Sequence, residues 1–185
     1  LSTVYATNAS GNFFLPEPDD EVVVGFMNED PGHPIILGGV YGERHKPPYE
    51  YEAKNNTKAI VTREKMRIEF NEEKKMVKIS TPGKNTVEIS DDDKHIKLTD
   101  QNKNEIVMNS SGISFSSAKD ITLKAKGAIT MDATSKFSAT AKQDVSLEGL
   151  NVNMQAKVSA AVKGNAKAEL SASGQTTVKG GMVII

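Results

Sequence analysis

The sequence predicts an all-β protein in which a small, turn-rich first region precedes a long trimeric β-prism. Six of the seven prolines lie in residues 1–48, and only three of the ten aromatic residues lie beyond residue 52. Beyond residue 112, apolar residues recur with a period of eight. Large rings bury the most area per side chain in an ordinary core, so a long stretch with three Phe must be built differently.

The first region, residues 1–48, is predicted to form short strands joined by tight turns. Glu21–Phe26 is a strand, Asn28–Pro34 is a turn rich in Pro, Gly and Asp, and Ile35–Tyr41 is a second strand with a glycine bend. A strand pair bent at glycine suits a small β-barrel. Residues 49–65 are polar and are predicted to be a linker.

From residue 66 to 112, apolar residues occur in pairs two positions apart, and the pairs repeat every nine or ten residues. These pairs are Ile68/Phe70, Val77/Ile79, Val87/Ile89, Ile96/Leu98 and Ile106/Met108. Spacing two places both members on one face of a strand. The connectors, such as Thr81–Asn85 and Asp100–Asn104, are typical turn sequences.

The repeat then tightens to eight residues and continues to the end of the chain, with one seven-residue step between Val145 and Val152. Three columns of residues, two positions apart within each unit, contain no charged residue at any of their 27 positions. A tract with 25% charged residues would hold six or seven. We predict that the larger members form a trimer core: Ile113, Phe115, Ile121, Leu123, Ile129, Met131, Phe137, Val145, Leu147, Val152, Met154, Val162, Leu170 and Val178.

Each eight-residue unit is therefore expected to be one short strand, apolar inside and polar outside, followed by a corner such as Lys126–Ala128. So few small apolar residues per unit bury too little area to offset backbone ordering in a single chain. Closure then needs three chains around one axis, which predicts an obligate homotrimer with an intertwined β-helix over residues 66–185. About 14 strands at about 4.8 Å spacing predict a shaft of roughly 65–70 Å.

Two simpler interpretations remain for the polar, Ala-rich segment. A Lys/Ser/Thr/Ala-rich tract is often disordered, but uninterrupted uncharged columns over nine units argue against disorder here. An amphipathic helix over 156–172 is the other alternative. The columns there keep a period of eight with spacing two, and Val, Thr and Ser are poor helix formers.

Composition excludes several function classes. With no Cys, the chain has neither disulfides nor a thiol nucleophile, and the redox compartment stays undecided. No run of 18 apolar residues and no signal peptide are visible. The net charge of −1 predicts no bulk attraction to nucleic acid or anionic lipid. That charge is uneven, because residues 1–65 carry 6 basic and 10 acidic groups and residues 66–185 carry 17 and 14.

Candidates for chemistry are few. His33, His45 and His95 are expected to be surface or structural residues, and no metal or cofactor is expected. Asp91–Asp93 could contact a hard cation, but a solvated hairpin turn is the favoured interpretation. A carboxylate pair for glycoside hydrolysis could come from the group Glu17, Asp19, Asp20 and Glu21, although four acids beside prolines are more often an exposed turn.

The last six residues end the chain on apolar side chains. Exposed apolar patches mark interaction sites, so this end is predicted both to close the prism and to dock a capping protein. The predicted docking residues are Gly180, Gly181, Met182, Val183, Ile184 and Ile185.

The first region resembles the OB-fold segment of VgrG proteins, the spike proteins of type VI secretion, which are related to phage tail spikes. The resemblance lies in Pro16–Phe26, Asp30–Tyr41 and His45–Pro48. In this family a barrel of the OB type precedes a trimeric β-prism, so the resemblance extends over the whole chain. The family commonly has Gly where Asp19 and Glu29 stand, which leaves the conformation of those turns open.

The resemblance implies a non-enzymatic spike of a contractile injection system. It would sit on the hub at the end of the tube, carry a PAAR-repeat tip protein on its blunt end, and pass mechanically through the target membrane, with effector cargo as a further possible partner. Such a spike is assembled in the bacterial cytoplasm and then injected into the target envelope. The chain is expected to be the carboxy-terminal part of a longer protein.

The resemblance also bears on metal binding, since some family spikes bind iron through tip histidines and this sequence has none after His95. Two other functions stay open. One is a glycan-degrading enzyme on a trimeric β-helix, and the other is a trimeric adhesin shaft. The residues do not distinguish a type VI machine from a phage-like one.

Overall fold

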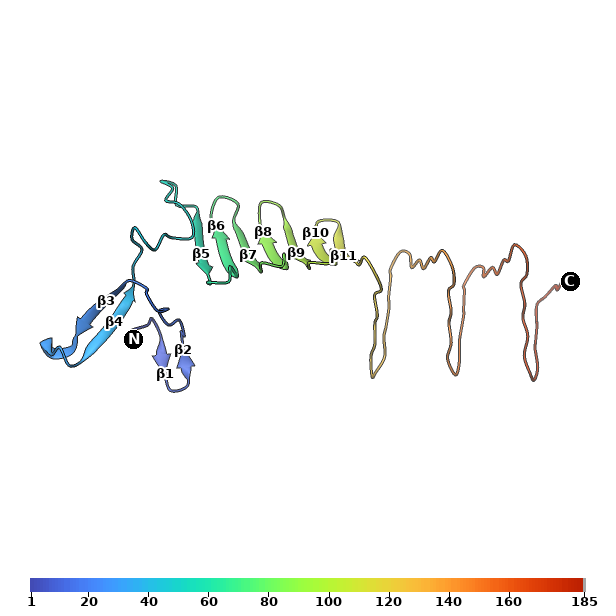
Figure 1. Cartoon of the computed structure of the whole chain (residues 1–185). Coiled ribbons are helices and arrows are strands. Elements are labelled where there is room, and N and C mark those ends of the chain that lie inside the picture. The colour runs from blue at the N-terminus through green and yellow to red at the C-terminus, as the bar shows by residue number, and fades with distance from the viewer. Residues whose placement is uncertain (185) are drawn as a thin grey trace. The chain divides into compact units, whose positions relative to one another are not determined.

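The computed structural model describes residues 1–184 (Figure 1), and within them almost all regular structure is β. The all-β prediction is confirmed. The chain divides into two compact units, Leu1–Lys124 and the part from Ala125 onward, and each is described by itself. Residues 1–184 contain no helix with the length and hydrophobicity needed to span a bilayer.

The first unit begins with two short antiparallel strand pairs. Strands β1 (Ala6–Thr7) and β2 (Ser10–Gly11) form the first pair, and β3 (Val22–Phe26) and β4 (Pro34–Gly39) form the second. The β3–β4 register shifts between Val23 and Val24, opposite Gly38 and Ile36, so Leu37 is an extra residue in β4. This bulge lies next to Gly38, at the predicted glycine bend. Glycine inside a strand often marks a bulge, because it tolerates backbone that deviates from the regular ladder.

The turn between β3 and β4 is held by side chains as predicted from its composition. It contains the short 3₁₀ segment Met27–Glu29. The Asp30 carboxylate accepts the backbone N–H of Gly32 at 2.8 Å and lies 2.8 Å from Nδ1 of His33. These contacts lower the pKa of Asp30, with the Gly32 N–H as the larger cause. His33 is thus a turn residue, in agreement with its predicted structural role.

Asp19 and Glu29, which stand where the family commonly has Gly, both adopt the left-handed backbone conformation. Their φ angles are 74° and 63°. Side chains with a Cβ are strained in this region, whereas Gly enters it freely. The two turns therefore keep the backbone geometry that glycine favours, although the residues differ.

The main element of the first unit is a seven-stranded antiparallel meander in which every strand pairs with its sequence neighbours (Figure 1). Each predicted apolar pair from Ile68/Phe70 to Ile106/Met108 lies in one of its strands. The strands are β5 (Thr57–Val61), β6 (Arg67–Asn71), β7 (Met76–Ser80), β8 (Thr86–Ser90), β9 (His95–Thr99), β10 (Glu105–Asn109) and β11 (Gly112–Ser116).

Five of the hairpins in this sheet use a lysine with positive φ to reverse the chain. The residues are Lys65, Lys75, Lys84, Lys94 and Lys103, with φ between 46° and 68°. In the last of these turns, the Lys103 N–H donates to the Asp100 carbonyl, and the Asp100 N–H donates to the Asn104 carbonyl. A left-handed residue at this place gives the tight reversal that antiparallel pairing requires.

The predicted linker, residues 49–65, is corrected by the structure. It contains β5, which pairs along its whole length with β6. Upstream of β5, the Tyr49 hydroxyl donates to the Glu69 carboxylate at 2.6 Å, and Arg67 lies 6.0 Å from the centre of the Tyr49 ring. Partial burial and the hydrogen bond to Glu69 raise the pKa of Tyr49. The sheet therefore begins before residue 66, because Ala59, Ile60 and Val61 supply a short strand inside a polar segment.

From residue 117 to residue 184 the chain is extended and forms no strand pairing (Figure 1). Backbone bends recur at 118–119, 126–127, 134–135 and 142–143, then at 150, and again at 157–158, 165–166, 173–174 and 181–182. The spacing is eight residues with one step of seven after residue 150, which is the rhythm of the apolar columns. The predicted corner at Lys126–Ala128 is confirmed by the bend at 126–127.

Candidate assembly interface

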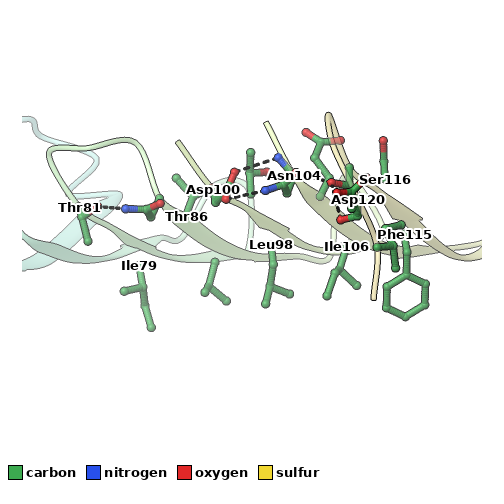
Figure 2. A pocket seen from close by; sticks show the side chains of 16 residues that line it. Ile79, Thr81, Thr86, Leu98, Asp100, Asn104, Ile106, Phe115, Ser116 and Asp120 are labelled. Carbon is green, nitrogen blue, oxygen red and sulfur yellow. Dashed lines mark hydrogen bonds between the residues drawn. The ribbon is translucent and has the colours of Figure 1, made fainter. Parts of the chain in front are cut away.

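The meander stacks its apolar residues into two continuous cross-strand ladders on one face. Strand register places one residue of each of the seven strands in the first ladder: Ile60, Ile68, Ile79, Val87, Leu98, Ile106 and Phe115. The second ladder runs parallel to it through Phe70, Val77, Ile89, Ile96, Met108 and Ile113. We call this the apolar sheet face. Figure 2 shows Ile79, Leu98, Ile106 and Phe115 projecting from the same side of the sheet.

Nothing within the described chain covers this face. No hydrophobic side chain in residues 1–184 is buried, and Ser90 is the only buried residue among them. Of the first ladder, Ile60, Ile68, Ile79, Val87, Leu98 and Phe115 are 36–67% exposed. Fully burying a side chain of this size contributes about 1.5–3 kcal/mol. Exposed apolar area of this extent is typical of a surface that contacts a partner.

A hollow of about 550 Å³ crosses one end of the strands β7 to β11 and continues the apolar sheet face (Figure 2). Its apolar lining includes Ile79, Val87, Leu98, Phe115 and, beyond the last strand, Ile121. Asp100 and Asn104 lie on its polar rim. The pKa of Asp100 is lowered, chiefly by the backbone N–H of Asn104, so this carboxylate serves to organise a turn. The apolar part of the hollow is open surface that a packed partner would fill.

The opposite face of the sheet carries alternating charges. Register aligns Glu69, Lys78, Glu88 and Lys97 across four neighbouring strands. The Lys78 ammonium lies 3.0 Å from Glu88, and the Lys97 ammonium lies 2.8 Å from Glu105. Opposite charges directly across a strand pair stabilise a sheet. The two faces therefore differ sharply, and the charged face is the one suited to water.

His95 joins this charged face. Its Nε2 lies 2.9 Å from Oε1 of Glu88, and both side chains are only 20% exposed. The pKa of Glu88 is lowered, first by the hydrogen bond from Lys78 and also by that from His95, against the opposing effect of burial. The prediction of a structural histidine agrees with this geometry, whereas sequence reasoning missed the pair with Glu88.

Three groups at this place could approach a metal ion together. Potential ligand atoms of Glu88, Asp93 and His95 lie within 4.8 Å of one another. Each carboxylate already has a partner, since Glu88 contacts Lys78 and Asp93 lies 3.1 Å from the Ser90 hydroxyl. The arrangement is that of a hydrogen-bonded ion-pair network. The predicted turn at Asp91–Asp93 is present between β8 and β9.

The predicted trimer-core residues beyond the sheet are all exposed in the single chain. From Ile121 to Val178 their exposed fractions run from 52% to 79%. Residues 121–184 also make no backbone hydrogen bond with one another or with the rest of the described chain. Extended backbone away from water must pair its N–H and C=O groups. Within the described chain, this segment thus has neither apolar cover nor backbone hydrogen-bond partners.

The predicted docking residues lie at the end of the described chain. Met182 and Ile184 are 81% and 85% exposed, and Val183 is 48% exposed. The backbone bends at Gly181–Met182, which continues the eight-residue rhythm to this end. Ile185 lies outside the described residues. Their role in docking stays a prediction.

The acidic group considered for glycoside hydrolysis lies in a turn before β3. The Asp20 carboxylate accepts the Glu17 N–H at 2.7 Å, and the Glu17 carboxylate lies 2.8 Å from Arg63. Glu17 and Arg63 are both more than half exposed. These contacts are those of a hydrogen-bonded surface turn, as the sequence pattern favours.

Taken together, the geometry defines a class of protein: an all-β chain whose apolar sheet face and extended segment stay uncovered within the described residues. Comparison with known proteins identifies the family. Residues 76–185 match the family model of the phage baseplate V C-terminal trimerisation domain, and residues 1–41 match that of the type VI secretion system/phage-baseplate injector OB domain. The chain belongs to this family of VgrG and phage-baseplate spike proteins.

A curated relative agrees with this assignment. Over 60 residues the chain is 35% identical to the type VI secretion system spike protein VgrG4b of Pseudomonas aeruginosa. The match covers 32% of this chain and 7% of that relative's length. The OB prediction is confirmed for residues 1–41, and the trimerisation domain supports the predicted homotrimer. The predicted boundary at residue 48 stays a prediction.

Proposed function

We propose that the chain is a non-enzymatic piercing spike of a contractile injection system. In this proposal residues 1–48 form the OB segment seated on the hub of the tube, and residues 66–185 form a trimeric β-prism needle. The sheath would drive this needle from the bacterial cytoplasm through the target envelope, together with a tip protein and any effector cargo.

One observation carries the proposal. Residues 57–184 present apolar side chains in an unbroken periodic order, yet the single chain buries none of them. Three copies around one axis would bury the apolar sheet face and the columns together, and they would pair the extended backbone of residues 121–184. A close-packed interior of this kind resists deformation, which a needle requires. Closing the strands around the axis also removes exposed strand edges.

The end of the needle is proposed to carry a PAAR-repeat protein on Met182, Val183, Ile184 and Ile185. Three chains would gather twelve apolar side chains at this end, and exposed apolar patches of this kind favour protein contacts. Gly180 and Gly181 lack side chains, which allows a partner to approach the backbone closely.

The tip assignment is tested by binding of a purified PAAR-repeat protein to variants of the chain. We expect Met182→Asp and Ile184→Asp to weaken binding at least tenfold, because each trimer then presents three carboxylates to an apolar surface. Ser171→Asp is the matched control, since it adds the same charge between two columns and away from the end. Unchanged binding by both tip variants would remove Met182–Ile185 as the docking site.

A further inference from the structure

The charges of the chain are distributed along its length in a way that the net value of −1 hides. Residues 1–65 carry a net charge of −4, residues 66–116 carry −1, and residues 117–184 carry +4. The last of these segments holds nine lysines and five acidic residues. The part of the chain proposed to travel foremost is therefore the cationic part.

The asymmetry is strongest in residues 150–184, which contain four lysines and a single acidic residue, Glu169. Lys167 forms an ion pair with Glu169. The other three lysines, Lys157, Lys163 and Lys179, form no ion pair within the described chain. We call these three residues the shaft lysines.

Column spacing places the shaft lysines away from the apolar columns. Lys163 stands between the column residues Val162 and Gly164, and Lys179 stands between Val178 and Gly180. Alternation along an extended chain directs such intervening residues to the opposite face. Lys157 lies in the bend at 157–158, and all three shaft lysines are exposed. In a trimer they would place nine ammonium groups around the outside of the shaft.

We propose that the shaft lysines bind the phosphate groups of anionic phospholipid headgroups. The inference rests on the proposed function, because it needs the trimeric shaft. Lysine is a compact point charge that suits phosphate without fixed geometry. Each lysine near an anionic bilayer strengthens binding about fivefold, and this attraction is screened over about 10 Å in 0.1 M salt. The local charge, and not the near-neutral total, decides the interaction of the shaft with a membrane.

The test is co-sedimentation of the purified 185-residue chain with vesicles of phosphatidylglycerol and phosphatidylethanolamine, compared with vesicles of phosphatidylcholine. We expect binding to the anionic vesicles alone, falling at least tenfold between about 50 and 500 mM NaCl. The triple variant Lys157→Gln, Lys163→Gln, Lys179→Gln should lose at least tenfold of this binding. The control variant Lys65→Gln, Lys84→Gln, Lys103→Gln removes the same number of charges from hairpins of the sheet. This control should still bind the anionic vesicles.

Any of the following results would overturn the proposal. Equal binding to phosphatidylcholine vesicles would indicate apolar insertion, and equal losses in the two triple variants would indicate net charge alone. Retention on duplex DNA without vesicle binding would assign the lysines to nucleic acid. Sedimentation velocity on the same samples separates the two proposals: a trimer that ignores anionic vesicles overturns only the lipid inference, whereas a monomer overturns the proposed function.

Discussion

The meander of residues 57–116 and the extended segment of residues 117–184 carry the same apolar alternation but satisfy it differently. The meander repeats every nine or ten residues, and its left-handed lysines turn each strand back onto the previous one. The extended segment repeats every eight, and its described residues contain no positive φ. The strands of the longer repeat pair within the chain, whereas residues 121–184, with the shorter repeat, pair with no part of the described chain.

Both regions leave their apolar residues uncovered in the single chain. A strand has two requirements, partners for its backbone hydrogen-bonding groups and cover for its apolar side chains. The meander meets the backbone requirement by itself and lacks only apolar cover. The extended segment lacks both, which makes it the more dependent on assembly.

The largest effect is expected for Leu147→Asp in the extended segment. Three carboxylates would then meet in a narrow interior, where even a neutral polar group without a partner costs roughly 2–7 kcal/mol. We expect loss of the trimer in sedimentation velocity. The control is Ser146→Asp, which adds the same charge between the column residues Val145 and Leu147. This variant should stay trimeric. A trimeric Leu147→Asp variant would show that the columns do not line the interior.

A smaller, pH-dependent effect is expected for Glu88→Gln on the charged face of the sheet. The contacts with Lys78 and His95 lower the pKa of Glu88 in the folded chain from its ordinary 4.5. The ionised group therefore contributes stability that is fully present above pH 4.5 and is lost as the pH falls through the lowered pKa. Removing it should cost about 1–2 kcal/mol at pH 7.

The measurement is thermal unfolding of the wild type and the Glu88→Gln variant between pH 7 and pH 3. The two curves should converge in acid, because the wild-type carboxyl is then protonated. Glu50→Gln, at an exposed position, serves as the control. A stability difference that stays constant across this range would show that the ion pairs with Lys78 and His95 do not stabilise the sheet.

The smallest effect is expected for Lys103→Gly in the hairpin between β9 and β10. Its φ of 68° strains a residue with a Cβ, and glycine removes that strain at some cost in unfolded-state entropy. We expect a net stabilisation of roughly 0.5 kcal/mol, measured by denaturant unfolding. Ser114→Gly in strand β11 should instead destabilise by about 0.5–1 kcal/mol. Destabilisation by Lys103→Gly would mean that the lysine side chain stabilises the turn.

Much of this architecture could be predicted from apolar spacing. The pairs Ile68/Phe70 through Ile106/Met108 mark strands β6 to β10, because alternation depends only on local geometry. The bends of residues 117–184 follow the columns for the same reason. The positions of the docking and core residues in an assembly stay predictions.

Other features depend on contacts that spacing does not encode. Strand β5 lies in a polar segment without periodic apolar pairs, and only its Ile60 continues the first apolar ladder. The short pair β1–β2 has no apolar alternation. His95 and Glu88, seven residues apart, meet only because the hairpin folds β9 back onto β8. Periodicity identifies strands, whereas pairing within the chain also depends on the turns that join them.

We infer that this chain completes its fold only as a trimer. The decisive measurement is sedimentation velocity of the purified 185-residue chain, combined with sedimentation equilibrium for the mass. We expect a single elongated species with three times the 20.0 kDa mass of the chain. A stable, folded monomer of 20.0 kDa would contradict it, because the exposed apolar columns and unpaired backbone would then need no partner.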